Sequence, residues 1–344
     1  MGIDDIQGLL EELSASGAER AVQVAVYRDG EEVLSAAAGG ATPETVFYTY
    51  SSMKAGMSAL VHVCVREGMF GYDTALAKLW PEFAEHGKGD VTVRHVLTHS
   101  AGLPAVPPDT TPEDLCDWDG MCARLAAAEP WWPAGAKMAY HAITYGYLAG
   151  EVVRRATGLA PGAALRELVA APIGFPDELY FGMPPVEQPR LAPLVDAADI
   201  TGMPDDSPML RTVPRALLPT AEYGNRPDIL AADIPAGGKN TARALAALYS
   251  ALIDGTLLPP AQLAEVTAVA LSAKDEVMGN DARWCLGFAV GRPGSDSADA
   301  FCLAGAGGTF AWADRATGTT VAVAKNLLTP GFDTAQRVCD LVYA

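Results

Sequence analysis

Apolar and polar positions follow helical spacing in several stretches of the chain. In residues 3–14, isoleucines and leucines recur at intervals of three and four, which predicts an amphipathic helix. A long apolar run begins near residue 51 and stops before Gly68, and another stops at Gly158; glycine often follows the last turn of a helix. On this pattern, the predicted helices cover residues 3–14, 51–67, 92–97, 143–157, 241–252 and 333–343.

Strands are predicted near both ends of the chain. Residues 22–27 and 32–37 favour strands, and Asp29-Gly30 between them predicts a tight hairpin turn. Residues 46–50 form a short extended lead into residue 51. Further strands are predicted at residues 284–290, 301–303, 309–313 and 319–326, the last two joined by a turn at residues 314–318. We expect the strands from the two ends to complete one antiparallel sheet.

The middle of the chain differs from both ends. Prolines and glycines are frequent in residues 71–235, and residues 184–235 show neither strand nor helix periodicity. This organisation predicts an α+β fold. Residues 1–70 and 236–344 would form a unit with the central sheet and flanking terminal helices. Residues 71–235 would form a mainly helical, loop-rich insertion, with an active site at the interface of the two.

Composition narrows the class of protein. The chain has 344 residues, 50% of them hydrophobic, which is enough for a large core. No apolar stretch reaches the roughly 20 residues of a transmembrane helix, and no signal peptide is visible, so a cytoplasmic protein is expected. The formal net charge of −18 argues against nucleic acid and anionic membranes as partners.

The sequence indicates no metal site. The six cysteines are scattered without a C-x-x-C pair, which fits reduced thiols. His95 and His99 form an H-x-x-x-H pair that lacks the glutamate of a zinc protease. We therefore expect no bound metal.

Ser51 and Lys54 are the best candidates for chemistry. They form an S-x-x-K spacing at the start of a predicted helix, where positions three apart share one face. A partly desolvated lysine can take the proton of a serine hydroxyl and so make it nucleophilic. The helix N-terminus adds a positive field where an oxyanion would form.

Tyr140 is the best candidate for a second proton-transfer group. It follows a turn at Trp132-Pro133-Ala134-Gly135 and precedes the helix predicted from residue 143, so its loop can face a cleft. Beside a lysine ammonium the pKa of Tyr140 is expected to fall, which suits proton transfer. A packed aromatic residue is the structural alternative.

Other residues near Ser51 fit a catalytic role less well. Ser52 would place Lys54 two positions away, on another face of the helix, so we reject it as the nucleophile. Tyr48 and Tyr50 lie on the extended lead-in and are expected to form the wall of a site. Trp131 and Trp132 could line an acyl pocket or pack in the core.

The chain resembles the serine β-lactamase and penicillin-binding-protein superfamily, nearest the class C β-lactamases and the related esterases. S-x-x-K is the first motif of this superfamily. The likeness extends in order over most of the chain. It is carried by Ser51-Ser52-Met53-Lys54, by Arg94-His95-Val96-Leu97-Thr98-His99-Ser100-Ala101-Gly102-Leu103, by Tyr140-His141-Ala142, by Pro235-Ala236-Gly237-Gly238 and by the strand and glycines in residues 301–314.

The resemblance implies a β-lactamase/transpeptidase-like fold and a role for each matching residue. Ser51 would be the acyl-accepting nucleophile, Lys54 its general base or electrostatic partner, and Tyr140 the proton relay to the leaving group. The backbone N–H groups of Ser51 and Ala306 would form the oxyanion hole. Arg94 and His99 would be structural. No metal or organic cofactor is implied.

One motif departs from the family pattern. Where the family has Lys-Thr-Gly or His-x-Gly, this chain has Leu303-Ala304-Gly305, which keeps the glycine and loses the polar side chain. Recognition of penicillin-type substrates is therefore less expected, and a neutral or apolar substrate more so. His141 could partly replace the lost group or point away, and Trp132 could contact the substrate.

Three functions remain open from the sequence. The first is a hydrolase of a small-molecule ester, lactone, thioester or amide working through an acyl-serine. The second is a transacylase that passes the acyl group to an alcohol or amine in a biosynthetic pathway; the lost polar motif and the missing export signal tilt the balance toward it. The third is a catalytically silent binding or regulatory protein on the same fold. The sequence does not specify the oligomeric state.

Overall fold

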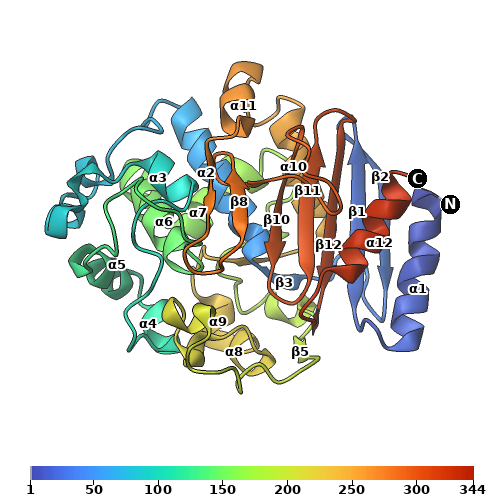
Figure 1. Cartoon of the computed structure of the whole chain (residues 1–344). Coiled ribbons are helices and arrows are strands. Elements are labelled where there is room, and N and C mark those ends of the chain that lie inside the picture. Colours follow the sequence, from blue (N-terminus) through green and yellow to red (C-terminus); the bar gives the residue numbers. More distant parts are fainter. Residues whose placement is uncertain (1) are drawn as a thin grey trace.

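The computed structural model describes residues 2–344 and is built around one antiparallel sheet (Figure 1). The eight strands lie in the order β2-β1-β12-β11-β10-β9-β8-β7. Strand β1 pairs with β2 on one side and with β12 on the other, so the two ends of the chain do complete one sheet. The strands are β1 (Val22–Arg28), β2 (Glu31–Ala38), β7 (Leu271–Lys274), β8 (Asp281–Trp284), β9 (Ala289–Val290), β10 (Ala300–Gly305), β11 (Thr309–Asp314) and β12 (Thr319–Lys325).

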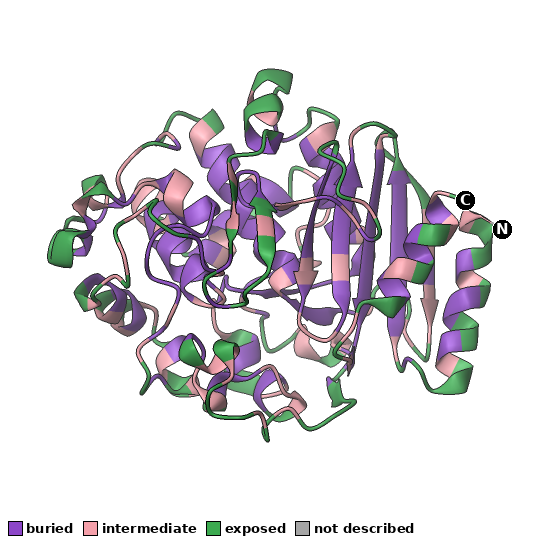
Figure 2. Cartoon of the chain, viewed as in Figure 1, coloured by how far each residue is buried: buried purple, intermediate pink, exposed green. Residues whose placement is uncertain are grey.

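The alternation of side chains along the strands supplies both faces of this sheet with apolar residues. On one face, Val24 and Val323 pack with the terminal helices α1 (Ile6–Ser16) and α12 (Asp333–Val342). On the other face, Ala25 and Ala322 pack toward α10 (Ala242–Ile253). Strand β12 lies in the sheet between these two layers of helices and is buried at every position (Figure 2).

Helix α2 (Lys54–Arg66) packs against α6 (Thr144–Thr157), α7 (Pro161–Leu165) and α10. The first eleven residues of α2 are buried on every side, as expected for a central helix (Figure 2). The other helices are α3 (Val93–Leu97), α4 (Pro112–Cys116), α5 (Trp118–Ala127), α8 (Ala221–Gly224), α9 (Pro227–Ala231) and α11 (Pro260–Thr267). None of the helices within residues 2–344 has the length and apolar character needed to cross a bilayer.

Two small sheets join the helical region to the central sheet. One has the order β3-β6-β4, formed by Phe47–Tyr50, Gly238–Asn240 and Leu179–Tyr180. The other pairs β5 (Val195–Asp196) with β13 (Leu327–Leu328) in parallel. The largest cluster of buried residues contains members from both expected units. The division into 1–70 plus 236–344 and 71–235 therefore stays a prediction.

The α+β class and the six predicted helices are confirmed, whereas one predicted strand is wrong. Residues 284–290 are not one strand, because β8 ends at Trp284 and β9 begins at Ala289. The turn between them is buried: Gly287 has φ +86° and donates its N–H to the carbonyl of Leu97 at 3.0 Å. A buried turn has the same apolar composition as a buried strand, so hydrophobic pattern does not separate the two.

Candidate active site

Ser51 and Lys54 meet at the junction of β3 and α2. Strand β3 ends at Tyr50, and a single 3-10 turn, Ser51–Met53, leads into the helix. The Lys54 Nζ lies 2.9 Å from the Ser51 Oγ, the contact that the i, i+3 spacing predicts. The same Nζ donates to the carbonyls of Ala142, at 2.8 Å, and Ala236, at 2.5 Å. Two distant loops therefore fix the amine against the serine.

Burial sets the protonation state of Lys54. Its side chain is 1% exposed, and this desolvation lowers the pKa of Lys54 to about 7. In its neutral form the amine has two N–H groups, which match the two carbonyl acceptors, and one lone pair. That lone pair is left for the hydroxyl of Ser51. The arrangement can therefore remove the proton of Ser51 near neutral pH.

Ser52 faces away from this pair. Its hydroxyl lies 3.0 Å from the Thr309 hydroxyl on β11, and Thr309 in turn donates to the carbonyl of Thr49 at 2.8 Å. Ser52 is also fully buried. These contacts confirm that Ser52 belongs to the packing between α2 and the central sheet.

The backbone just before Ser51 is strained. Tyr50 has φ +48° and ψ −128°, a conformation that residues other than glycine rarely adopt. Gly237 packs directly on it, because a Cβ at residue 237 would lie 2.9 Å from the carbonyl carbon of Tyr50. The Tyr48 and Tyr50 rings stack with centroids 4.2 Å apart and line the cavity, as expected of wall residues.

Tyr140 comes to the same point from the loop before α6. The Lys54 Nζ lies 5.1 Å from the centroid of its ring. Burial raises the pKa of Tyr140 to about 12, opposed by a hydrogen bond with Ser51 and reinforced by the negative charge of Asp275. The expectation that its pKa falls is therefore wrong, because desolvation of the phenol is the largest influence on it. Tyr140 is a phenol at neutral pH and can donate a proton.

Two of the predicted substrate-binding residues do not reach the cavity. His141 is buried: its Nδ1 lies 2.6 Å from the carbonyl of Ala139, and its Nε2 accepts the N–H of Leu103 at 3.3 Å. Both nitrogens are thus taken by the backbone. Trp132 stands against the Lys137 ammonium, 5.6 Å from its ring centroid, and is likewise outside the cavity lining. The prediction that their side chains bind substrate does not fit these positions.

Arg94 and His99 make the structural contacts that the resemblance implied. Arg94 forms ion pairs with Asp73 at 2.7 Å and with Glu265 at 3.2 Å. The buried His99 accepts the N–H of His141 on its Nδ1 at 3.1 Å. His99 therefore supports the loop that carries Tyr140.

The end of β10 forms another part of the cavity wall. Leu303, Gly305 and Ala306 all line the cavity. A Cβ at Gly305 would lie 2.1 Å from the carbonyl oxygen of Thr49, so packing between β10 and β3 alone requires glycine here. Ala306 and Ser51 border the same cavity, which is compatible with the predicted oxyanion hole; that role stays a prediction.

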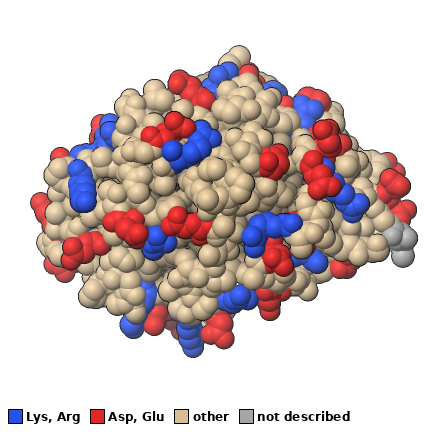
Figure 3. All heavy atoms as spheres, turned by 90° about the horizontal axis from the view of Figure 1, so that it is seen from above, with Lys and Arg blue, Asp and Glu red and all other residues tan. Residues whose placement is uncertain are grey.

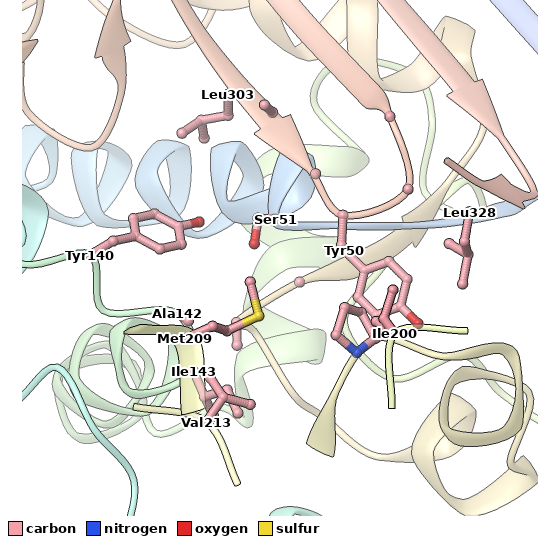
Figure 4. Close-up of a pocket in the computed structure, with 18 of the residues that line it drawn as sticks. Tyr50, Ser51, Tyr140, Ala142, Ile143, Ile200, Met209, Val213, Leu303 and Leu328 are labelled. Atoms are coloured by element: carbon pink, nitrogen blue, oxygen red, sulfur yellow. The ribbon is translucent and has the colours of Figure 1, made fainter. Parts of the chain in front are cut away.

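The cavity beside Ser51 has a volume of about 710 Å³ and is mainly apolar. Figure 4 shows Ser51 between Tyr140 and Tyr50, with Met209, Ile143 and Val213 facing it. Among the described residues that line the cavity, none is lysine or arginine, and Asp196 alone carries a formal charge. Ligands without a negative charge therefore match this cavity best.

The sequence pattern missed one wall of the cavity and one buried carboxylate. Residues 196–219 contribute Ile200, Met209 and Val213, but this segment has no regular periodicity. Asp275 accepts the backbone N–H of Tyr140 at 3.0 Å. No sequence signal pointed to it, because the strand that precedes it, Leu271–Lys274, was not predicted.

The surface carries both signs of charge. On the face shown in Figure 3, lysines and arginines are interspersed with aspartates and glutamates. All six cysteines are free thiols, and only Cys116 is exposed. Within residues 2–344, no group of three or more His, Cys, Asp or Glu side chains is arranged to hold a metal ion.

Acid is expected to destabilise the protein below about pH 6.5, because buried histidines stay neutral in the folded state. Burial lowers the pKa of His62 to about 3 and that of His141 to about 4, and holds the pKa of His99 well below its usual value. The unfolded chain binds these protons near pH 6.5 and the folded chain does not. Each histidine then removes up to about 1.4 kcal/mol of unfolding free energy per pH unit. Thermal unfolding from pH 7 to 5 measures this loss.

A matched pair of variants isolates the histidine contribution. His62→Gln should make the loss of melting temperature between pH 6.5 and 5 shallower. His86→Asn should leave the slope unchanged, because His86 is exposed and asparagine tolerates its φ of +55°. A wild-type melting temperature that stays constant over this range would contradict the prediction.

Comparison with known proteins agrees with the fold. The beta-lactamase family profile matches residues 6–338. The esterase/beta-lactamase LipL of Mycobacterium tuberculosis is 32% identical over 339 aligned residues, which cover 89% of this chain and 77% of that protein. The similarity therefore extends over nearly the whole chain.

Two solved structures extend this similarity to three dimensions. A penicillin-binding-protein homologue from Caulobacter crescentus is 33% identical. Its alignment covers 99% of this chain and 96% of the homologue, with a TM-score of 0.86. A family VIII carboxylesterase is 30% identical, covers 98% of this chain and 96% of its own, and also gives a TM-score of 0.86.

Proposed function

The chain belongs to the beta-lactamase family, and from that premise we propose that it is a serine esterase that forms an acyl-enzyme on Ser51. One observation carries the proposal: the Ser51 hydroxyl is held 2.9 Å from a buried lysine amine whose pKa lies at about 7. Two of the relatives that are at least 30% identical, LipL and the family VIII carboxylesterase, have names that support ester cleavage as the reaction.

The first half-reaction makes the acyl-enzyme. Ser51 Oγ bonds to the ester carbonyl carbon while Lys54 Nζ takes its proton. The carbonyl oxygen becomes an oxyanion, which the backbone N–H groups of Ser51 and Ala306 would stabilise by roughly 3 kcal/mol each. As the intermediate collapses, the bond to the leaving oxygen breaks, and Tyr140 donates the proton to it. The proton on Lys54 then restores the phenol of Tyr140.

The second half-reaction releases the acid. A water oxygen bonds to the acyl carbon and gives its proton to Lys54. Collapse of this second intermediate breaks the bond to Ser51 Oγ, which takes the proton back from Lys54. An alcohol in the place of water would give a transfer product by the same steps.

The lining of the cavity supports a neutral, apolar substrate. A substrate carboxylate would need a cation, and none of the described lining residues supplies one. Leu303 stands where the family places a polar residue, and it is buried in the cavity wall. We therefore propose a carboxylic ester without a negative charge and with an apolar acyl group.

Substrate preference is the direct test of this proposal. We expect p-nitrophenyl esters of butyrate to octanoate to be turned over with kcat/KM at least about 100-fold above that of a cephalosporin, which leaves its carboxylate unpaired. Steady-state kinetics and intact-protein mass spectrometry of the acyl adduct measure both classes. Equal or better turnover of the cephalosporin would contradict the substrate class.

Two outcomes of the same experiment address the alternatives. Faster discharge of the acyl adduct by added alcohols or amines than by water would favour a transacylase. No adduct with any ester, nor with a fluorophosphonate, would favour a catalytically silent binding protein.

A further inference from the structure

Asp275 is a buried carboxylate that serves two segments at once. It follows β7, at the start of the turn to β8, and is 3% exposed. Its Oδ1 accepts the N–H groups of Val277 and Met278, both at 2.8 Å. Its Oδ2 accepts the N–H of Tyr140 at 3.0 Å, from a loop 135 residues away in the sequence. One side chain thus caps its own turn and holds the loop of the proposed proton donor.

Further contacts join the turn to the loop. The N–H of Glu276 donates to the carbonyl of Met138 at 3.0 Å. The ring of Tyr140 stacks on Trp284 of β8, with centroids 6.1 Å apart and an interplanar angle of 27°. Because Val277, Met278 and Trp284 also line the cavity, the turn, β8 and Tyr140 form one continuous wall beside Ser51.

The leaving group of an ester would contact this wall. Tyr140 gives its proton to the leaving oxygen in the proposed mechanism, so that oxygen must lie on the Tyr140 side of Ser51. Figure 4 shows Tyr140 on one side of Ser51, and Tyr50 and Leu328 on the other. The acyl chain would then extend toward Tyr50, and the alcohol part toward Val277 and Met278.

The chemistry of Asp275 suits a fixed anchor. Within residues 2–344, no lysine or arginine forms an ion pair with it, so three backbone N–H groups hold the carboxylate. Hydrogen bonds to an ionised acceptor are roughly twice as strong as neutral ones. The negative charge of Asp275 also adds to the burial that keeps the Tyr140 phenol protonated.

Resting on the proposed function, we propose that Asp275 is a positioning residue for Tyr140. Its hydrogen bond fixes the backbone of Tyr140 so that the phenol lies beside the leaving-group oxygen. Its other hydrogen bonds, to Val277 and Met278, connect Tyr140 to the part of the wall that contacts the leaving group. Asp275 itself touches no reacting atom and acts through Tyr140.

Asp275→Asn tests this role, because an amide has one acceptor oxygen where the carboxylate has two. With that oxygen still on Val277 and Met278, the amide NH2 faces the N–H of Tyr140 and that anchor is lost. We expect kcat for ethyl octanoate to fall by about 100-fold, which is the effect expected when a general acid is lost. The KM for this ester should change less than about threefold. For p-nitrophenyl octanoate kcat should fall less than about threefold, because nitrophenolate leaves without protonation.

A double-mutant cycle shows which residue Asp275 acts through. Tyr140→Phe should give the same contrast between the two esters, and the Asp275→Asn/Tyr140→Phe double variant should match Tyr140→Phe alone. Asp275→Ser provides a second variant, since a hydroxyl can cap the turn without reaching the N–H of Tyr140. It should repeat the contrast between the esters.

Asp233→Asn is the matched control. The Asp233 carboxylate also accepts two backbone N–H groups, from Gly162 at 2.9 Å and Gly182 at 3.0 Å, but it does not contact Tyr140. Its variant should affect both esters equally. Equal losses on both esters in Asp275→Asn, together with a lowered melting temperature, would overturn the positioning role. So would additive effects in the cycle. A wild type that cleaves neither ester would instead overturn the proposed function.

Discussion

Replacing Ser51 with alanine is expected to lower kcat/KM for p-nitrophenyl octanoate by at least about ten-thousand-fold. The variant has no atom that can bond to the acyl carbon, so both half-reactions stop. Intact-protein mass spectrometry should show an acyl or phosphonyl adduct on the wild type and none on the variant. The fold should be retained, because Ser51 lies on the cavity wall and its hydroxyl accepts a hydrogen bond from Lys54 within the site.

The neighbouring serine is the control for this substitution. Ser52→Ala removes the 3.0 Å contact with Thr309 between α2 and β11, and should cost about 1 kcal/mol of unfolding free energy. Its kcat/KM should stay within a few-fold of the wild type. Loss of activity in Ser52→Ala with activity retained in Ser51→Ala would move the nucleophile to Ser52 and contradict the proposed site.

Lys54→Met should lower kcat/KM by about a thousand-fold and remove its dependence on pH near neutrality. Burial lowers the pKa of Lys54 to about 7, and only the neutral amine can take the proton of Ser51. In the wild type kcat/KM should therefore fall about tenfold per pH unit below pH 7 and level off above it. The pH profile of kcat/KM for a neutral ester, measured from pH 5.5 to 9, shows this limb.

Lys239 offers a matched control for the pH profile. It is equally buried, its pKa is also lowered to about 7, and it donates to the carbonyls of Phe181 and Ile229 without touching Ser51. Lys239→Met should keep the acid limb where it is, whatever its effect on stability. If kcat/KM of Lys54→Met also fell below pH 7, the group that titrates would be another residue, and Lys54 would not be the base.

Local spacing along the chain was enough to predict the nucleophile and its base. Ser51 and Lys54 are three positions apart, and the 3-10 turn that leads into α2 brings side chains at this spacing onto one face. The strong periodicity of residues 3–14 and 143–157 likewise predicted α1 and α6. These features depend on neighbours within a few residues, which the sequence states directly.

The orientation of loop side chains depended on contacts far away in the sequence. His141 is next to Tyr140, yet the carbonyl of Ala139 and the N–H of Leu103 turn its ring away from the cavity. The sign of the shift in the pKa of Tyr140 was also mistaken. The degree of burial, which decided it, is a property of the whole packed molecule.

The sequence by itself determined the α+β class, the main helices and the Ser51–Lys54 contact, because each follows from short-range periodicity or motif spacing. The order of the predicted elements also indicated that strands from the two chain ends share one sheet, but the tertiary structure set the pairing of Val22 with Lys325. Only the tertiary structure decided the apolar character of the cavity, the part played by residues 196–219 and the anchoring of Tyr140 by Asp275. These features join segments more than a hundred residues apart. No local pattern records such a meeting, since it arises from the packing of the complete chain.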